Sequence, residues 1–216
     1  MPEAITLDMN SLPVQYLCKK DKRLAKVISM VGPITYKTHA EDPYAFLIHE
    51  IIEQMLSVKA GAKIYSRLET LCNGNISPES VNCLTDSEIK SIGTADSKVL
   101  YIRSLTNAVM NGELQFESLV NMKSEDVFKK LTSIRGIGNW TAKMYLLFVL
   151  DHPDILPFED VAFLQTYEWM YKTKDRSRES VCKKCTKWKP YSSTAARFMY
   201  RALDMGLTKE EFHLYK

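Results

Sequence analysis

The chain has 216 residues, of which 45% are hydrophobic and 25% charged, a composition typical of a folded domain and not of a disordered chain. The net charge of +3 is too small to indicate a nucleic-acid partner by itself. The sequence has no apolar run of the roughly 18 residues that a membrane span needs, and its start, MPEAITLDMNSLPV, lacks the pattern of a secretory signal, so we expect a protein that works inside the cell.

Helical periodicity with start and stop signals runs through most of the chain. Asp42-Pro43 is typical of a helix start, Asn73-Gly74 is typical of a helix end, and Thr85 with Glu88 forms a capping box. Strand signals are nearly absent outside the first few residues. The predicted helices begin, in chain order, at Pro43, after a Ser57 cap, after Ser77, after Thr85, at Asp96 or Ser97, after a Ser124 cap and at Trp140, and continue over about 160–171, 177–188 and 192–205, with a last helix capped by Thr208 and Glu211. The pattern predicts an all-α fold with about ten short helices.

The five cysteines favour neither a disulfide framework nor a metal site. Cys18, Cys72 and Cys83 lie within helical patterns and are expected to be small core residues. Cys182 and Cys185 form a CxxC, but no second metal-ligand pair follows, so a helical face is favoured over zinc. An iron–sulfur cluster of the usual kind is excluded because it needs four closely spaced cysteines.

A basic stripe occupies the segment between Tyr171 and Lys189. A stripe of this kind can follow a phosphate backbone, and it is equally typical of a solvated helix face. Its cations are Lys172, Lys174, Arg176, Arg178, Lys183, Lys184, Lys187 and Lys189.

The turn IRGIG lies between two amphipathic helical segments and predicts a phosphate site. Gly136 and Gly138 permit backbone conformations and close approaches that a side chain would block. The following helix begins at once, so its free N–H groups and its dipole suit an anion. Apolar residues at helical spacing flank the turn and favour a hairpin of helices: Leu131 and Ile134 before it, Ala142 and Leu146 after it.

The segment LTSIRGIGNWTAKMYLLFVLDHPDILPFEDVAF resembles the helix-hairpin-helix, Gly/Pro-rich loop and aspartate module of base-excision DNA glycosylases, the HhH-GPD superfamily. Within it the chain is most similar to the alkylation-repair branch, the 3-methyladenine DNA glycosylase II and yeast-type alkylpurine enzymes. EDPYAFLIHEIIEQMLSVKAGAKIYSRLE resembles the early helix pair of the family and KWKPYSSTAARFMYRAL its closing helix. No counterpart to the N-terminal β-domain of the bacterial enzyme is recognisable, so a compact version is expected.

The resemblance implies a two-lobed helical fold that binds double-stranded DNA across the cleft between its lobes. One lobe would be discontinuous, residues 1–37 with 158–216, and the other, residues 38–157, would contain the hairpin. It also implies a monomer that acts on DNA containing alkylated bases or abasic sites, in the nucleus of a eukaryote or the cytoplasm of a prokaryote.

Asp160 stands at the position of the family's catalytic aspartate. A buried carboxylate there would stabilise the oxocarbenium character of the sugar and orient water. The alternative is that Asp160 only caps the helix that follows, and Glu159 is the next candidate acid. Trp140 replaces the nucleophilic lysine of bifunctional relatives, so no Schiff base and no strand cleavage are expected.

The resemblance also assigns a base pocket and a wedge. Trp140, Met144 and Tyr200 would line the pocket for a flipped base, although Trp140 and Tyr200 are also typical of ordinary core aromatics. Gln54, Met55, Leu56 and Ser57 would be pushed into the minor groove, with Met55 or Leu56 filling the gap left by the extruded nucleotide. Phosphate contacts are predicted for the hairpin and for nearby lysines: Ile134, Gly136, Gly138, Thr141, Lys59, Lys98 and Lys143. No cofactor or metal ligand set is expected beyond a monovalent ion at the hairpin carbonyls.

Departures from the family pattern leave two functions open. Met55 lies in QMLS where the family usually reads QQ(L/V)S, Met144 replaces a pocket tyrosine, and Ser192 replaces an arginine. The first hypothesis is a monofunctional glycosylase for alkylated purines. The second is an inactive or weak homologue that binds damaged or abasic DNA, and a scaffold for undamaged duplex or protein is least favoured.

Overall fold

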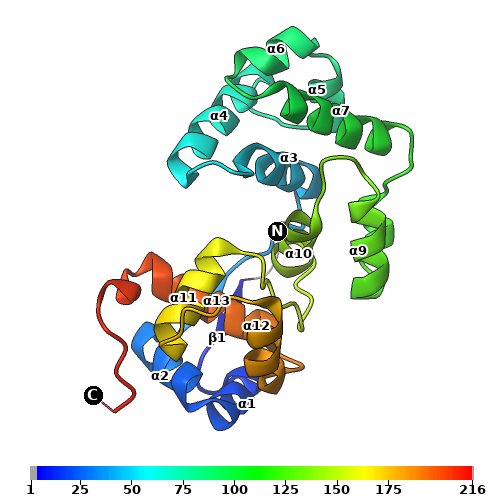
Figure 1. Cartoon of the computed structure of the whole chain (residues 1–216). Coiled ribbons are helices and arrows are strands. Elements are labelled where there is room, and N and C mark those ends of the chain that lie inside the picture. Colours follow the sequence, from blue (N-terminus) through cyan, green and yellow to red (C-terminus); the bar gives the residue numbers. More distant parts are fainter. Residues whose placement is uncertain (1–3, 216) are drawn as a thin grey trace. The chain divides into compact units, whose positions relative to one another are not determined.

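The structure, a computed structural model, describes residues 4–215, which form two compact units (Figure 1). The terminal unit comprises the described residues of Met1–Thr38 and Asp151–Lys216, and the hairpin unit is His39–Leu150. The expected boundary followed residue 157, whereas the structure groups residues 151–157 with the terminal unit because Asp151 bonds to Tyr36 and Arg197. No helix among the described residues is long and apolar enough to cross a bilayer.

The hairpin unit is entirely helical in its regular structure. Its helices begin where the sequence carries capping signals: Pro43 is the first residue of a helix, the Ser57 hydroxyl accepts from Ala60 N at 3.3 Å, and Thr85 with Glu88 completes a capping box. The helices are α3 (Pro43–Glu53), α4 (Val58–Leu71), α5 (Pro78–Asn82), α6 (Asp86–Ser91), α7 (Asp96–Met110), α8 (Phe116–Leu119), α9 (Ser124–Thr132) and α10 (Asn139–Phe148).

The core of the hairpin unit gathers around α3 and α10. Tyr145 of α10 is buried, with its ring centroid 6.4 Å from that of Phe46 and 6.2 Å from that of Phe116. On α3, Leu47 and Ile51 are fully buried one helical turn apart. These contacts fix α3, whose C-terminal end leads into the predicted wedge.

The terminal unit combines a short strand pair with the helices of both chain ends. β1 and β2 are antiparallel, with Ile5 opposite Tyr36 and Leu7 opposite Ile34. The core lies where α13 packs on α2 and α11, with Ala195, Phe198 and Met199 fully buried. The elements are β1 (Ile5–Leu7), α1 (Leu12–Lys20), α2 (Lys22–Val31), β2 (Ile34–Tyr36), α11 (Val161–Tyr171), α12 (Arg178–Cys185), the 3-10 turn η1 (Thr186–Trp188), α13 (Ser192–Asp204) and the 3-10 turn η2 (Leu207–Lys209).

The predicted all-α class is confirmed, with differences in detail. The described residues form thirteen α-helices where about ten were expected. The strand signalled at the start of the chain is β1, and it pairs with a second strand, β2, that was not expected. Residues 1–3 of the chain lie outside the described part. Ser124 is the first residue of α9 and not its cap, which is Lys123.

The prediction of a last helix capped by Thr208 and Glu211 is wrong. Gly206 ends α13 in the left-handed region (φ 73°), and only the 3-10 turn η2 follows. The indole N–H of Trp169 then donates to the Glu210 carbonyl at 2.7 Å. Thr208 lies inside η2 and Glu210, which follows that turn, has extended backbone. No helix of the described residues therefore begins after Thr208.

Asp21 is a buried carboxylate at the centre of the terminal unit. It caps α2 by accepting from Arg23 N at 3.0 Å, and its other oxygen accepts from Trp188 Nε1 at 2.9 Å and lies 3.1 Å from Lys187 Nζ. Its side chain also accepts a hydrogen bond from the Tyr171 hydroxyl. One acid therefore joins α2, α11 and η1.

Because of the hydrogen bonds to Asp21, we expect the free energy of unfolding to decrease at acidic pH. Burial raises the pKa of Asp21, but the hydrogen bonds from Tyr171, Trp188 and Lys187 outweigh it and hold the pKa below the ordinary 3.8. A depressed folded pKa stabilises the protein above the unfolded value, and this contribution is lost as the pH falls below it. Asp21→Asn should lower the free energy of unfolding near neutral pH by about 2 kcal/mol, with a flatter dependence of Tm on pH below about 5. Thermal melts across that range check this, with the exposed Asp204→Asn as control; parallel pH profiles for wild type and Asp21→Asn would contradict it.

Candidate functional site

The hairpin joins α9 to α10 through a tight turn. Ile137 N donates to Ile134 O at 3.0 Å, Gly136 has φ +97°, and Gly138 is the N-cap of α10. A Cβ on Gly136 would lie 2.3 Å from Cβ of Tyr101 on α7, so the turn backbone packs directly against that ring. A Cβ on Gly138 would meet nothing within 4 Å, which leaves the first turn of α10 open on that side.

The open first turn of α10 has the features of an anion site. Gly138 and Asn139 are exposed, and the N–H groups at the start of a helix have no intrahelical partner. Ile134 is half-buried, and Thr141 is buried, with its hydroxyl accepting from Gln54 Nε2 at 3.2 Å. The backbone of the turn is therefore the part that can meet a phosphate, whereas the Thr141 side chain is directed into the protein.

The turn between α3 and α4 presents apolar side chains to solvent. Met55 is 101% exposed with φ +61°, and Leu56 is 41% exposed. Ser57 caps α4, which opens with the 76% exposed Val58. The structure thus exposes the residues that the wedge requires, and their insertion into DNA stays a prediction.

Gln54 differs from its neighbours because its side chain turns inward. Its Nε2 donates to Gly136 O at 2.9 Å as well as to Thr141. The side-chain amide N–H groups of Gln54 are thus engaged with the hairpin, and a contact of this residue with the minor groove stays a prediction.

Two of the three lysines predicted to contact phosphate remain accessible. Lys59 is exposed on α4 and Lys143 is half-buried on α10. Lys98 is directed inward, because its Nζ donates to Ile52 O at 2.5 Å and to Gln54 O at 2.7 Å. It serves the end of α3 and does not face a phosphate.

The predicted base-pocket residues have different exposures. Trp140 is half-buried on α10, on the face it shares with Lys143 one turn later. Met144 is only 3% exposed, so it offers little surface to a base. Tyr200 is half-buried on α13 of the terminal unit.

Asp160 is the N-cap of α11 in the terminal unit. Its Oδ1 accepts a hydrogen bond from Phe163 N at 2.7 Å, and the residue is 8% exposed. Its backbone N–H donates to Pro157 O at 3.0 Å. The capping role is therefore confirmed, and capping by itself does not exclude a chemical role for the carboxylate. Glu159 is half-buried beside it.

The loop before Asp160 is tied to α13 by bonds that the sequence did not reveal. Ser193 N donates to Pro153 O at 3.0 Å, and its hydroxyl accepts from Ile155 N at 3.0 Å. Ser192 donates to Asp154, which gives a structural role to the serine that replaces an arginine. Two adjacent serines after a Pro-aromatic pair were the only signal of this loop anchor.

A second anchor holds the start of the same loop. Arg197 Nη2 donates to Asp151 Oδ1 at 2.7 Å, and its guanidinium lies 3.7 Å from the centroid of the Tyr36 ring. The Tyr36 hydroxyl donates to the same carboxylate at 3.1 Å, and burial raises the pKa of Tyr36 to about 12. Asp151 itself has φ +52°, a backbone conformation that these bonds stabilise.

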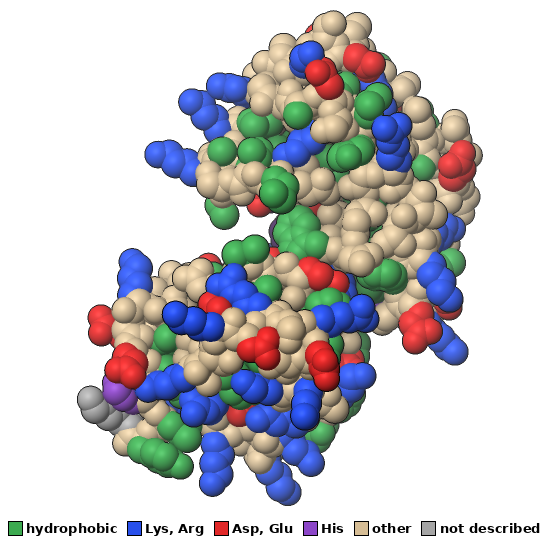
Figure 2. All heavy atoms as spheres, in the orientation of Figure 1, with side chains coloured by type: hydrophobic (Ala, Val, Ile, Leu, Met, Phe, Trp, Pro, Cys, Tyr) green, Lys and Arg blue, Asp and Glu red, His purple; other side chains and the backbone are tan. Residues whose placement is uncertain are grey.

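The basic stripe lies on and around α12, and Figure 2 shows Lys and Arg side chains crowding this face of the terminal unit. Several of them are engaged within the unit: Arg176 pairs with Glu168 at 2.5 Å and Lys172 with Glu211 at 2.6 Å. Lys184 Nζ lies 5.3 Å from the Tyr171 ring centroid. Part of the stripe is thus engaged in contacts within the unit, and phosphate binding by its other cations stays a prediction.

The cysteines lie on helices and turns without forming a ligand cluster. Cys185 is buried on α12, and burial raises the pKa of its thiol, while Cys182 is half-buried. Cys72 is buried as expected, but Cys83 is exposed, so the expectation of a core position is wrong there. Within residues 4–215 no group of three or more His, Cys, Asp or Glu side chains could hold a metal ion.

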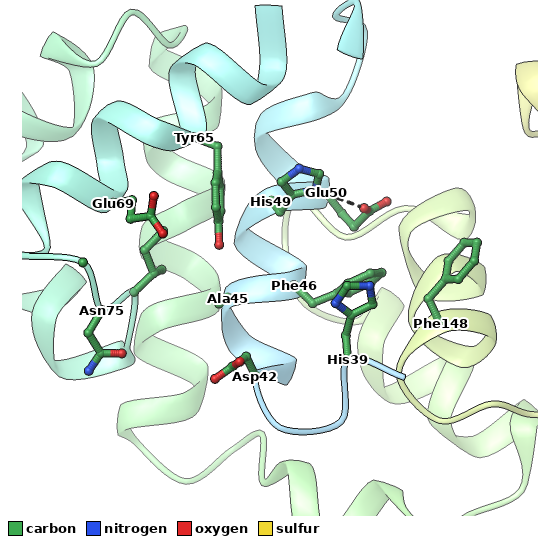
Figure 3. Close-up of a pocket in the computed structure, with 12 residues that line it drawn as sticks. His39, Asp42, Ala45, Phe46, His49, Glu50, Tyr65, Glu69, Asn75 and Phe148 are labelled. Carbon is green, nitrogen blue, oxygen red and sulfur yellow. Dashed lines mark hydrogen bonds and ion pairs between the residues drawn. The ribbon is translucent and has the colours of Figure 1, made fainter. Parts of the chain in front are cut away.

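A separate hollow of about 550 Å³ opens in the hairpin unit between α3 and α4 (Figure 3). His49 pairs with Glu50 at 3.4 Å, and its ring meets Tyr65 edge-on with centroids 4.9 Å apart. The hydrogen bond to Glu50 raises the pKa of His49. Asp42 and Glu69 add negative charge to the lining, so this hollow repels a phosphate backbone, and none of the residues predicted for the site lines it.

Comparisons with known proteins converge on one family. The sequence pattern described as "HhH-GPD superfamily base excision DNA repair protein" matches residues 48–190. The chain is 26% identical over 184 residues to "DNA-3-methyladenine glycosylase 1" of Schizosaccharomyces pombe, which covers 83% of this chain and 80% of that protein. It is similar to the crystal structure of a DNA-3-methyladenine glycosidase from Bacillus halodurans, with TM-score 0.84, 30% identity and 97% of each chain covered.

The same fold occurs in a structure with DNA bound. The 3-methyladenine DNA glycosylase Mag1 of S. pombe, in complex with abasic DNA, has TM-score 0.83 and 23% identity, with 95% of this chain and 100% of that chain covered. At this identity the likeness establishes the fold alone.

Proposed function

This chain belongs to the HhH-GPD superfamily of base excision DNA repair proteins, and we propose that it is a monofunctional DNA glycosylase. Its reaction would be hydrolysis of the N-glycosidic bond of alkylated purines, of the 3-methyladenine and 7-methylguanine type, to leave an abasic site in double-stranded DNA. The relatives named DNA-3-methyladenine glycosylase support this substrate class. Acting as a monomer is part of the proposal.

The observation that carries the proposal is the exposed apolar turn at Met55. A fully exposed methionine in the left-handed region is uncommon in a folded protein. It is useful where an apolar side chain replaces an extruded nucleotide in the base stack. The phosphate-binding turn that would hold the strand is bonded to the same loop through Gln54.

Asp160 would supply the chemistry. An alkylated purine is already a cationic leaving group, and positive charge develops on the sugar as the bond lengthens. A carboxylate of low exposure, fixed at the head of α11, can stabilise that charge and orient the attacking water. The hydrogen bond that Asp160 Oδ1 accepts from Phe163 N keeps the carboxylate from rotating away.

Trp140 makes the proposed enzyme monofunctional. An indole has no amine with which to form a Schiff base to the sugar, so strand cleavage is not expected. The half-buried indole of Trp140 is the aromatic side chain proposed to contact an electron-poor methylated base, and Tyr200 on α13 is proposed as a second aromatic contact for that base. A monovalent cation at the hairpin is proposed alongside, with backbone carbonyls such as Ile134 O and Gly136 O as its ligands, since each keeps a second lone pair.

The test is single-turnover release of methylated purines from alkylated duplex DNA by the wild-type protein. We expect release of 3-methyladenine or 7-methylguanine without strand cleavage. If the hairpin and the basic stripe bind phosphates, duplex affinity should also fall steeply with salt. No release, combined with tight binding of an abasic duplex, would establish the second hypothesis, a non-catalytic binder of damaged DNA. An affinity independent of salt would contradict both functions.

A further inference from the structure

We propose that Gln54, Lys98 and Tyr101 are positioning residues that brace the Met55 turn against the hairpin. The inference rests on the proposed function, since it concerns how the wedge is presented to DNA. All three residues belong to the hairpin unit, and they connect the end of α3, the turn of the hairpin and one face of α7.

Lys98 holds the end of α3. The last carbonyls of a helix lack intrahelical partners, and the helix dipole makes that end negative. Lys98 Nζ donates to two of these carbonyls, of Ile52 and Gln54, at 2.5 and 2.7 Å. Burial lowers the pKa of Lys98 and Glu53 opposes that shift, so the amine is partly desolvated at its acceptors. These bonds fix the residue that directly precedes Met55.

Met55 needs such support because its backbone conformation is unfavourable. A φ of +61° is rarely adopted by a residue with a long side chain, and such conformations persist where the surroundings determine them. On its other side the turn is closed by Leu56 N donating to Glu53 O at 2.9 Å and by the Ser57 cap of α4.

Gln54 connects this turn to the hairpin. Its Nε2 donates to Gly136 O at 2.9 Å and to the buried Thr141 hydroxyl at 3.2 Å. One side chain therefore joins the residue before the wedge to the carbonyl in the middle of the phosphate-binding turn.

Tyr101 completes the brace from α7. It follows Lys98 by one helical turn and lies on the same face of the helix. A Cβ on Gly136 would lie only 2.3 Å from Tyr101 Cβ, so Tyr101 packs against the hairpin at a place where only glycine fits. One face of α7 thus contacts both the wedge turn and the hairpin turn.

The consequence is that Met55 and the hairpin backbone form one pre-organised block. Ordering a flexible wedge on binding would oppose base extrusion, whereas a turn ordered beforehand avoids that entropy loss. Loss of the brace should therefore weaken the response to a lesion and leave phosphate binding nearly unchanged.

Lys98→Met tests this, because it keeps the aliphatic stem and removes the donors. The probe is a duplex with a tetrahydrofuran abasic analogue beside 2-aminopurine, whose fluorescence rises when the stack is opened. We expect about tenfold weaker binding to the abasic duplex, as for loss of charged hydrogen bonds, and loss of most of the fluorescence rise. Affinity for undamaged duplex should stay within about twofold of wild type and its salt slope nearly unchanged, since Lys98 Nζ is bonded to backbone carbonyls and not to phosphate.

Lys98→Arg should restore most of the fluorescence signal, because it keeps donors at the same place, and Lys90→Met on α6 is the matched surface control. Gln54→Met is the second variant and should reproduce the loss even if Lys98→Met folds poorly. A wild-type fluorescence rise in both methionine variants would overturn the brace, and so would an equal loss of binding to abasic and undamaged duplex. If wild type itself shows no preference for the abasic duplex, the proposed function fails instead.

Discussion

Asp160→Asn should abolish base release while leaving the fold and the DNA affinity intact. Asparagine caps helices about as well as aspartate, so the bond from Phe163 N to the side chain is retained. What is lost is the negative charge that the proposed mechanism places beside the sugar, and removal of one such electrostatic group costs at least about 100-fold in rate. Single-turnover release of methylated purines measures the effect, and the Tm and the affinity for abasic duplex show that the rest of the protein is unchanged.

The adjacent acid provides the control. Glu159→Gln makes the same chemical change one residue earlier, at a half-buried position that caps no helix. Release at the wild-type rate is expected for this variant. If Glu159→Gln is the inactive protein and Asp160→Asn is active, the catalytic role belongs to Glu159, and Asp160 is only a cap.

The sequence was sufficient to predict features that depend on neighbouring residues. Ser57 caps α4 and Asp160 caps α11 because each hydrogen bond is made to a backbone N–H three residues away. The hairpin could be recognised for the same reason, since two glycines and the helical spacing around them lie within one short segment. The exposure of Met55 followed from its place between a helix end and a helix cap.

Features that depend on distant residues could not be predicted. A lysine in a helix reads as a surface cation, and only the packing of α7 on α3 turns Lys98 toward the carbonyls of Ile52 and Gln54. Gln54 also turns to a partner far along the chain, Gly136. Met144 shares a helix with Trp140, and helical periodicity alone did not show that it would be buried.

The boundary between the units shows the same limit. Asp151 follows directly after the apolar run that contains α10, and the family resemblance placed it in the hairpin lobe, residues 38–157. Its partners Tyr36 and Arg197 come from β2 and α13, far away in the chain, and they draw the loop into the terminal unit. The short strand β2 escaped notice because three residues carry too little alternation to identify a strand.

Of all single Gly→Ala substitutions in the hairpin unit, Gly136→Ala should be the most destabilising. The added Cβ would lie 2.3 Å from Tyr101 Cβ, which is backbone-proximal and cannot swing away, and φ is +97°. Overpacking and left-handed strain together predict a loss of about 3 kcal/mol in the free energy of unfolding, or about 8 °C in Tm for a chain of this size. Urea denaturation and thermal melts measure both quantities.

Two glycines separate the contributions. Gly74→Ala has the same kind of strain, with φ +83° but nothing within 4 Å of the new Cβ, so it should lose only about 1 kcal/mol. Gly138→Ala has neither strain nor a clash and should lose only the preference for Gly over Ala at an N-cap, about 0.5–1 kcal/mol. If Gly136→Ala loses no more than Gly74→Ala, then Tyr101 yields to the methyl group and the hairpin turn is not held against α7. In that case Tyr101 would not be part of the brace, whereas a larger loss would show that the hairpin turn is held by the same face of α7 that fixes the end of α3.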